Sequence, residues 1–122
     1  MPDRIFSCIM KIGVSAVLKA QDIQVTQLLK KRIRAITKIK RMIVFGSRAR
    51  GDATEDSDLD VFIELPELTS DLRQQIYTVA WEIGFDHGIV ISTFLVTTPL
   101  LTNSLLAANP IVHAIETEGV VV

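Results

Sequence analysis

The chain has 122 residues, of which 48% are hydrophobic, and a net charge of -1, so it can build one domain with a core but not two. Its only cysteine, Cys8, excludes an internal disulfide and with it the class of disulfide-stapled secreted proteins. The apolar stretch over residues 5–20 is interrupted by Lys11 and is too short to span a bilayer. We therefore expect one cytoplasmic domain over residues 1–122 without membrane contact. Residues 1–20 are either an N-terminal extension or a loosely packed first helix.

The charges are distributed unevenly along the chain. Of the 13 basic residues, 12 lie at or before Arg50, and 12 of the 14 acidic residues lie at or after Asp52. One interpretation is that two halves of opposite sign attract each other and present solvated faces. The other is that basic residues contact phosphate while acidic residues hold a cation. The crowding of both signs between Gly46 and Asp60 favours the second interpretation.

A helix and two strands are predicted in the first half. Apolar residues recur at helical spacing between Ile23 and Lys40. They are Val25, Leu29, Ile33 and Ile36. The opposite face is basic but carries no interleaved aromatic residues, so it indicates a solvated face and makes nucleic acid an unlikely partner. The apolar run 42–45, which ends at Gly46, predicts a buried strand, and the alternation over 59–65 predicts a second one.

The second half is predicted to hold a helix, a strand and further helices. Thr69 or Ser70 can cap a helix that Gly84 is placed to end, and residues 88–96 have the β-branched pattern of a strand. Pro99 and Pro110 each follow a capping residue and predict helix starts, the last helix ending before Gly119. This order of elements predicts an α+β fold in which a small mixed sheet packs on helices.

Asp58 and Asp60 form the first candidate site. They lie two residues apart at the start of the second strand, so their side chains project to one side, about 6 to 7 Å apart at the backbone. Two such carboxylates can converge on one cation, and Mg²⁺ prefers oxygen ligands from one or two carboxylates together with substrate phosphates. Alone, an Asp-x-Asp pair is a weak signal, because many solvated turns contain one.

The corner after the first strand strengthens that signal. Gly46 has no side chain, so a ligand can approach its backbone closely, and Ser47 adds a hydroxyl and an amide where backbone N–H groups are unpaired. Arg48 and Arg50 lie within reach, and guanidinium groups pair well with phosphate oxygens. We favour Arg48 over Arg50 as the phosphate contact, since one of the two can instead bridge to the surrounding acids.

The segment GSRARGDATEDSDLD resembles the G-S-x10-D-x-D signature of the DNA polymerase beta nucleotidyltransferase superfamily, specifically its minimal nucleotidyltransferases. Ten residues separate Ser47 from Asp58. The residues in register with the signature are Gly46, Ser47, Arg48, Gly51, Ser57, Asp58 and Asp60. The resemblance extends over residues 23–122 and implies the polymerase beta-like fold.

The resemblance also implies an activity and roles for the residues. The reaction is transfer of a nucleoside monophosphate from a nucleoside triphosphate to a hydroxyl, with release of pyrophosphate. Gly46 and Ser47 would hold the β and γ phosphates, and Asp58 and Asp60 would bind two Mg²⁺ or Mn²⁺ ions. We assign Arg48, Arg50 and Ser57 to nucleotide binding as well.

One departure from the family pattern bears on turnover. Active members usually carry a third acid on the strand that follows Asp-x-Asp, and here the matching positions, Val90 or Ser92, are not acidic. Asp86 precedes that strand and would serve only if its loop folded inward. Nucleotide and metal binding are therefore expected more firmly than turnover, because loss of a general base slows a reaction about 10² to 10⁴-fold without preventing binding.

Two hypotheses follow. The first is a magnesium-dependent nucleotidyltransferase acting on a hydroxyl, and the second is a nucleotide-binding module that has lost turnover and acts by binding a partner. The resemblance suggests a small helical HEPN protein as that partner, in a toxin-antitoxin pair. The aliphatic residues between Leu95 and Ile115 also suggest a homo-oligomer or a heteromeric interface.

Overall fold

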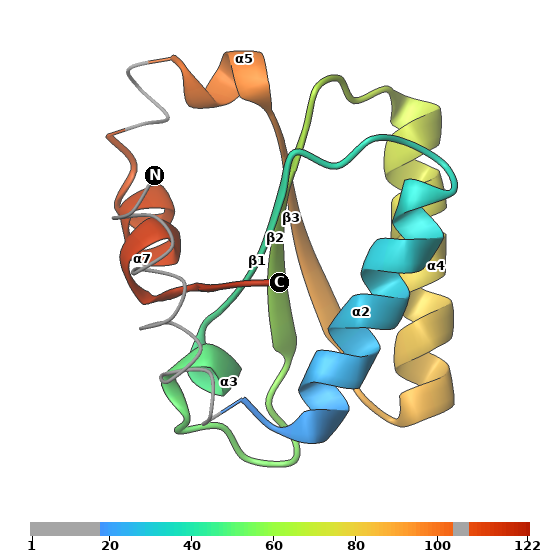
Figure 1. Ribbon diagram of the computed structural model, residues 1–122, viewed down its shortest axis with the longest axis vertical. Helices are drawn as coiled ribbons and strands as arrows, with labels where there is room; N and C mark the ends of the chain where they lie inside the picture. Colours follow the sequence, from blue (N-terminus) through green and yellow to red (C-terminus); the bar gives the residue numbers. More distant parts are fainter. Residues whose placement is uncertain (1–17, 104–107) are drawn as a thin grey trace, which may run out of the picture.

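The computed structural model describes residues 18–103 and 108–122. A four-stranded sheet, seen nearly edge-on in Figure 1, separates two helices on one face from a shorter helix on the other. The first two are α2 (Ala20–Arg34) and α4 (Ser70–His87), and the shorter one is α7 (Pro110–Glu118). This is the predicted α+β arrangement. The expectation for residues 1–20 falls largely outside the described residues.

The sheet has the order β3-β2-β1-β4. Its strands are β1 (Arg41–Phe45), β2 (Leu59–Leu65), β3 (Ile91–Thr97) and β4 (Val120–Val121). β1 pairs with β2 and with β4 in antiparallel fashion, whereas β2 and β3 are parallel and connected through α4. The first three strands confirm the predicted ones, and the two-residue β4 was not predicted.

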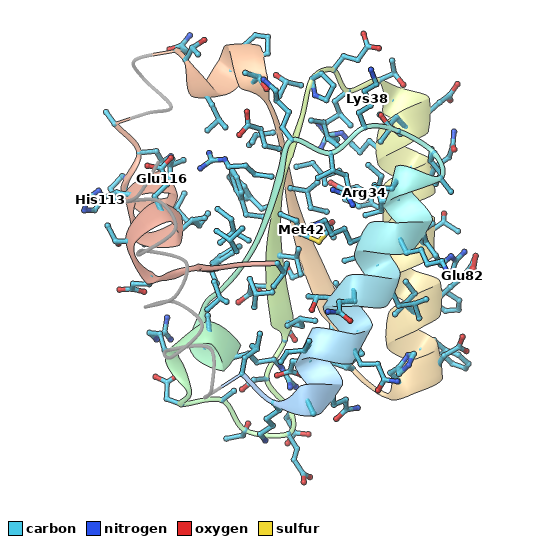
Figure 2. The ribbon with its side chains drawn as sticks, viewed as in Figure 1. Arg34, Lys38, Met42, Glu82, His113 and Glu116 are labelled. Carbon is cyan, nitrogen blue, oxygen red and sulfur yellow. The ribbon has the colours of Figure 1, made fainter. Side chains whose placement is uncertain are left out.

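The alternation along β2 decides which face each side chain occupies. Val61, Ile63 and their neighbours at odd positions pack towards α2 and α4, in the larger cluster of buried residues. Met42 belongs to the same cluster and points between the sheet and α2 (Figure 2). Phe62 packs on the other face against Ile115 of α7. Asp60 and Glu64 share the face of Phe62, so both carboxylates of β2 lie on the α7 side.

α4 and α7 begin at predicted caps, but two helices end at other residues than predicted. Thr69 caps α4 by accepting a hydrogen bond from the Leu72 amide, and Asn109 caps α7 in the same way at Ile111. α7 ends at Gly119, as expected. However, Gly84 does not end α4, which continues to His87 and closes at Gly88 with φ of 67°.

Gly84 is required by close packing instead. A Cβ at this position would overlap the carbonyl oxygen of Ile89, where the chain turns back from α4 towards β3. The longer helix also places Asp86 in the last helical turn of α4, not in the predicted loop.

The first predicted helix was extended too far. α2 ends at Arg34, because the amides of Ile36 and Thr37 both turn back to the Ile33 carbonyl. Ile36 is 39% exposed and so does not continue the buried stripe of Val25, Leu29 and Ile33.

In the short helix α5 (Thr98–Leu101), Thr97 is the cap and Pro99 lies in the first turn. None of the helices in the described part of the chain is both long and apolar enough to cross a membrane.

Candidate nucleotide and metal site

The two halves of the candidate site meet where β1 ends and β2 begins. Phe45 pairs with Asp60 in the antiparallel ladder, so the Gly46–Ser47 corner lies beside the Asp58–Asp60 pair. The strand pairing therefore brings together the two groups that the resemblance assigns to the triphosphate and to the metal ions. Backbone amides and carboxylates are thus presented at one corner of the sheet.

Gly46 lies directly against Asp60. Its φ of 75° belongs to the left-handed region, and a Cβ built on it would overlap the Oδ2 atom of Asp60. Any other residue would therefore strain the backbone and displace this carboxylate. The role of Gly46 on this side is to let the Asp60 carboxylate approach the turn.

Without a bound cation, the surroundings of Asp60 disfavour its ionised form. Burial raises the pKa of Asp60 above its usual value, the nearby carboxylate of Asp58 raises it further, and the Arg50 guanidinium lowers it. Two carboxylates that repel each other in a partly buried corner are stabilised by a bound cation. The donor set therefore fits Mg²⁺ or Mn²⁺, which takes carboxylate oxygens and completes its shell with water and phosphate oxygens.

Ser47 opens the single helical turn α3 (Ser47–Arg50), which Gly46 precedes as the N-cap. The Ser47 carbonyl accepts the amides of Gly51 and Asp52, which fixes the turn. Within the described residues, the Ser47 hydroxyl has no hydrogen-bond partner. It is thus free to donate to a ligand at the corner.

Arg48 points away from this corner, contrary to the expectation that it contacts phosphate. The residue is 5% exposed, and its Nη1 donates to Oδ1 of the buried Asp22 at 2.8 Å. Its Nε and Nη2 donate to the carbonyl of Ser57 at 3.0 and 2.7 Å, and Nη2 also reaches the Glu55 carbonyl at 3.4 Å. The fork of the guanidinium is occupied by the loop that leads to Asp58.

The side chains of Arg50 and Ser57 have other surroundings than that of Arg48. The Arg50 side chain is 46% exposed, its nearest carboxylates being Asp52 at 3.4 Å and Glu118 at 3.8 Å. Arg50 is therefore the arginine that can reach a phosphate. The Ser57 hydroxyl accepts the Thr54 amide at 2.9 Å, so it closes the turn before Asp58.

The comparison with known proteins agrees with this geometry. Residues 26–108, more than half of the chain, match the nucleotidyltransferase domain family. The chain belongs to this family. Within it, the chain is a minimal nucleotidyltransferase of the polymerase beta-like superfamily. A relative from Methanocaldococcus jannaschii, named "Putative protein adenylyltransferase", is 40% identical over 76 residues, which cover 60% of this chain and 77% of that protein. Family and relative together support an enzyme.

The third carboxylate expected of an active nucleotidyltransferase is replaced by a serine. Ser92 of β3 pairs with Asp60 in the parallel ladder and occupies the neighbouring position on the same face. Val90 precedes the strand and is 64% exposed, and Asp86 lies in α4. No group of three or more potential metal ligands among His, Cys, Asp and Glu occurs in the described part of this nucleotidyltransferase.

One residue that supports the site was missed from the sequence. Asp22 lies in the first turn of α2, is 2% exposed, and forms the buried ion pair with Arg48. The available signal was a single acid within a helix whose other charged residues are all basic, which does not identify its partner 26 residues away. The two histidines are not part of the site: His113 lies on the outer surface of α7 (Figure 2), and His87 contacts the Ile83 carbonyl in α4.

Proposed function

We propose that this nucleotidyltransferase transfers AMP from ATP to a hydroxyl group of a protein. The observation that carries the proposal is the packing of the Asp58–Asp60 pair against the Gly46–Ser47 turn. The choice of AMP and of a protein acceptor is supported by the name of the archaeal relative. In the reaction, the acceptor oxygen bonds to the α phosphorus, the bond between that phosphorus and the β-bridging oxygen breaks, and pyrophosphate leaves.

Each part of the corner has a task in this proposal. The Gly46–Ser47 turn binds the β and γ phosphates through its amides and the Ser47 hydroxyl. Arg50 pairs with a phosphate oxygen from the exposed side. Asp58 and Asp60 hold Mg²⁺, which would offset the charge of the triphosphate. Because the chain's own residues mainly position and neutralise the reactants, catalysis is chiefly electrostatic.

In this proposal Arg48 and Ser57 position the site and do not bind nucleotide. Their hydrogen bonds connect the buried start of α2 to the residue before Asp58. They keep the Asp58 carboxylate beside that of Asp60. The phosphate contact that the sequence suggested for Arg48 is assigned to Arg50 instead.

A second candidate function is supported by Ser92. A serine hydroxyl at the position beside Asp60 cannot accept the acceptor proton as a carboxylate does, so the site would turn over slowly or act by binding alone. In that case the chain would be a nucleotide-loaded module that occupies a partner, such as a HEPN-type helical protein. With either candidate function we propose a cytoplasmic location, which the single cysteine supports.

A labelling experiment separates the two candidates. The chain is incubated with Mg²⁺, a candidate HEPN-type partner and ATP, GTP, CTP or UTP labelled at the α phosphate, and label on the partner is measured. We expect transfer from ATP that Asp58→Asn and Asp60→Asn each reduce about 10²-fold or more and that Glu64→Gln retains. Binding of ATP by calorimetry without transfer favours the module, and neither binding nor transfer contradicts both candidates.

Ser92→Asp sharpens the result. If the corner is a weakened enzyme, restoring a carboxylate beside Asp60 raises turnover by about 10²-fold or more. Thr93→Asp is the matched control, because its side chain faces the opposite side of the sheet. Equal rates in both variants would contradict the assignment of Ser92 to the position of the third acid.

A further inference from the structure

α4 and β3 expose an apolar surface on the side of the sheet away from the candidate site. We call it the α4–β3 surface, and it comprises Tyr77, Trp81, Phe85, Val90, Ile91 and Thr93. These residues border a hollow of about 740 Å³. Trp81 and Phe85 are 67% and 73% exposed, and their rings stack with centroids 5.3 Å apart. Contiguous exposed apolar surface of this kind marks an interaction site.

The strand beside this surface is an unprotected edge. β3 pairs with β2 on its inner side, and no strand among the described residues pairs with its outer side. Its seven residues include neither a charged residue nor a proline, the features that usually prevent edge strands from pairing. The opposite edge is β4, which has only two residues. The sheet can therefore be extended at β3 and hardly at β4.

We propose that a second copy of this chain pairs with β3 in antiparallel orientation about a two-fold axis, so that the two α4–β3 surfaces cover each other. A two-fold contact places the same strand opposite itself. Because β3 is uncharged, this pairing brings no like charges together. An antiparallel arrangement also sets α4 of one copy against α4 of the other, with the aromatic pair of each in the contact.

The available area fits a dimer of ordinary size. At their exposed fractions, Trp81 and Phe85 leave on the order of 300 Å² of aromatic surface in water. Tyr77, Val90 and the outer side of a strand about 23 Å long add to it. The sum approaches the roughly 600 to 800 Å² that each partner buries in a standard interface. A docked loop or short peptide would cover less of this surface than a second α4 and β3.

The dimer leaves the candidate site open. Asp60 and Ser92 lie on the α7 side of the sheet, whereas the α4–β3 surface lies on the α4 side. With the axis perpendicular to the extended sheet, both sites face the same way. The strand of the second copy would run about 10 Å from β2, next to Ser92. This proposal does not depend on the reaction the site performs.

Sedimentation analysis over a wide range of chain concentrations tests the proposal. We expect a dimer, and Trp81→Lys should raise its dissociation constant about 30-fold or more, because a central aromatic is replaced by a charge. Val121→Lys is the matched control, since Val121 is 51% exposed on the opposite edge and should leave the dissociation constant unchanged. Circular dichroism verifies that both variants fold.

Hydrogen exchange distinguishes strand pairing from contact through the helices alone. The β3 amides that face away from β2 should become protected in the full chain as its concentration rises, and Trp81→Lys should remove that protection. A monomer at every concentration would overturn the proposal. So would a dimer that Val121→Lys disrupts while Trp81→Lys does not, or a dimer whose outer β3 amides exchange freely.

Discussion

Asp60 and Glu64 lie on the same face of β2, yet their surroundings are opposite. Burial alone would raise the pKa of Glu64, but hydrogen bonds from Thr98 at 2.7 Å and from Arg41 at 2.7 Å, with the charges of Arg41 and Lys40, lower it. Burial raises the pKa of Asp60, and the nearby Asp58 carboxylate raises it further. The negative charge at the Glu64 end of β2 is therefore balanced by protein groups, whereas that at the Asp60 end is balanced only in part.

The difference indicates where chemistry can occur on this fold. A carboxylate with its own protein partners stabilises the structure and has little left for a ligand. A pair of carboxylates held close together without a cationic partner between them lowers stability, and a bound cation reverses that effect. Four predictions can break or sharpen this comparison.

Asp22→Ala should have the largest effect, because it removes the support of the Asp58–Asp60 end. It leaves the buried Arg48 guanidinium without its carboxylate, which costs about 3 to 5 kcal/mol of unfolding free energy. Urea denaturation measures the loss. Replacing both partners, Asp22→Leu with Arg48→Met, should cost less than the sum of the two single changes. Additive losses would show that the ion pair does not couple α2 to the loop.

Asp60→Asn should reduce nucleotide transfer on the order of 10² to 10³-fold, because it weakens the site that holds the cation. Its melting temperature, measured without divalent ions, should not fall, since the change removes charge repulsion with Asp58. A variant that lost stability and activity together would contradict the view that this end of β2 is arranged for a ligand.

Glu64→Gln should behave in the opposite manner. Loss of the charge-assisted hydrogen bonds from Arg41 and Thr98 is expected to lower the unfolding free energy by roughly 1 to 3 kcal/mol. The rate of transfer under conditions where the variant is folded should stay close to that of the original chain. A large loss of activity in folded protein would place Glu64 in the site and contradict the distinction between the two ends of β2.

The smallest effect concerns pH and is read from the same two variants. A carboxyl with a lowered pKa stabilises the fold above its unfolded pKa, about 4.3 for Glu, and this stability is lost as the pH falls through the folded value. Asp60, with a raised pKa, is destabilising at neutral pH in the absence of cations, and this vanishes in acid. The Glu64→Gln and Asp60→Asn differences from the original chain should have opposite signs at pH 7 and converge on zero once the pH has fallen below the folded pKa of both carboxyls.

The sequence was sufficient for the register of the site. Alternation along β2 fixes which side chains face α7, and an antiparallel neighbour that ends at Gly46 then places the corner beside Asp60. The sequence left Val90 and Ser92 open as the position of the third acid, and the parallel register of β3 selects Ser92 as the neighbour of Asp60. Gly46 was singled out for the close approach of a ligand, and in the structure the group that lies against it is the Asp60 carboxylate.

What the sequence could not provide is the orientation of long side chains and the exact ends of helices. An arginine can reach a phosphate or a backbone carbonyl with equal ease, and only the fold shows that Asp22 and Ser57 take up the Arg48 guanidinium. Gly84 was taken as a helix end because glycine usually marks one, but close contact with Ile89 explains it here. Nor does the sequence indicate that Trp81 is exposed.

The Asp22–Arg48 pair has a consequence for dissecting this protein into smaller pieces. A fragment cut at the limits of the family match, 26–108, would retain the whole signature from Gly46 to Asp60 but lose Asp22. Its Arg48 would then be a buried cation with no counter-ion. The same fragment would also lack α7 and β4. Its inactivity would therefore say nothing against the chemistry of the signature itself.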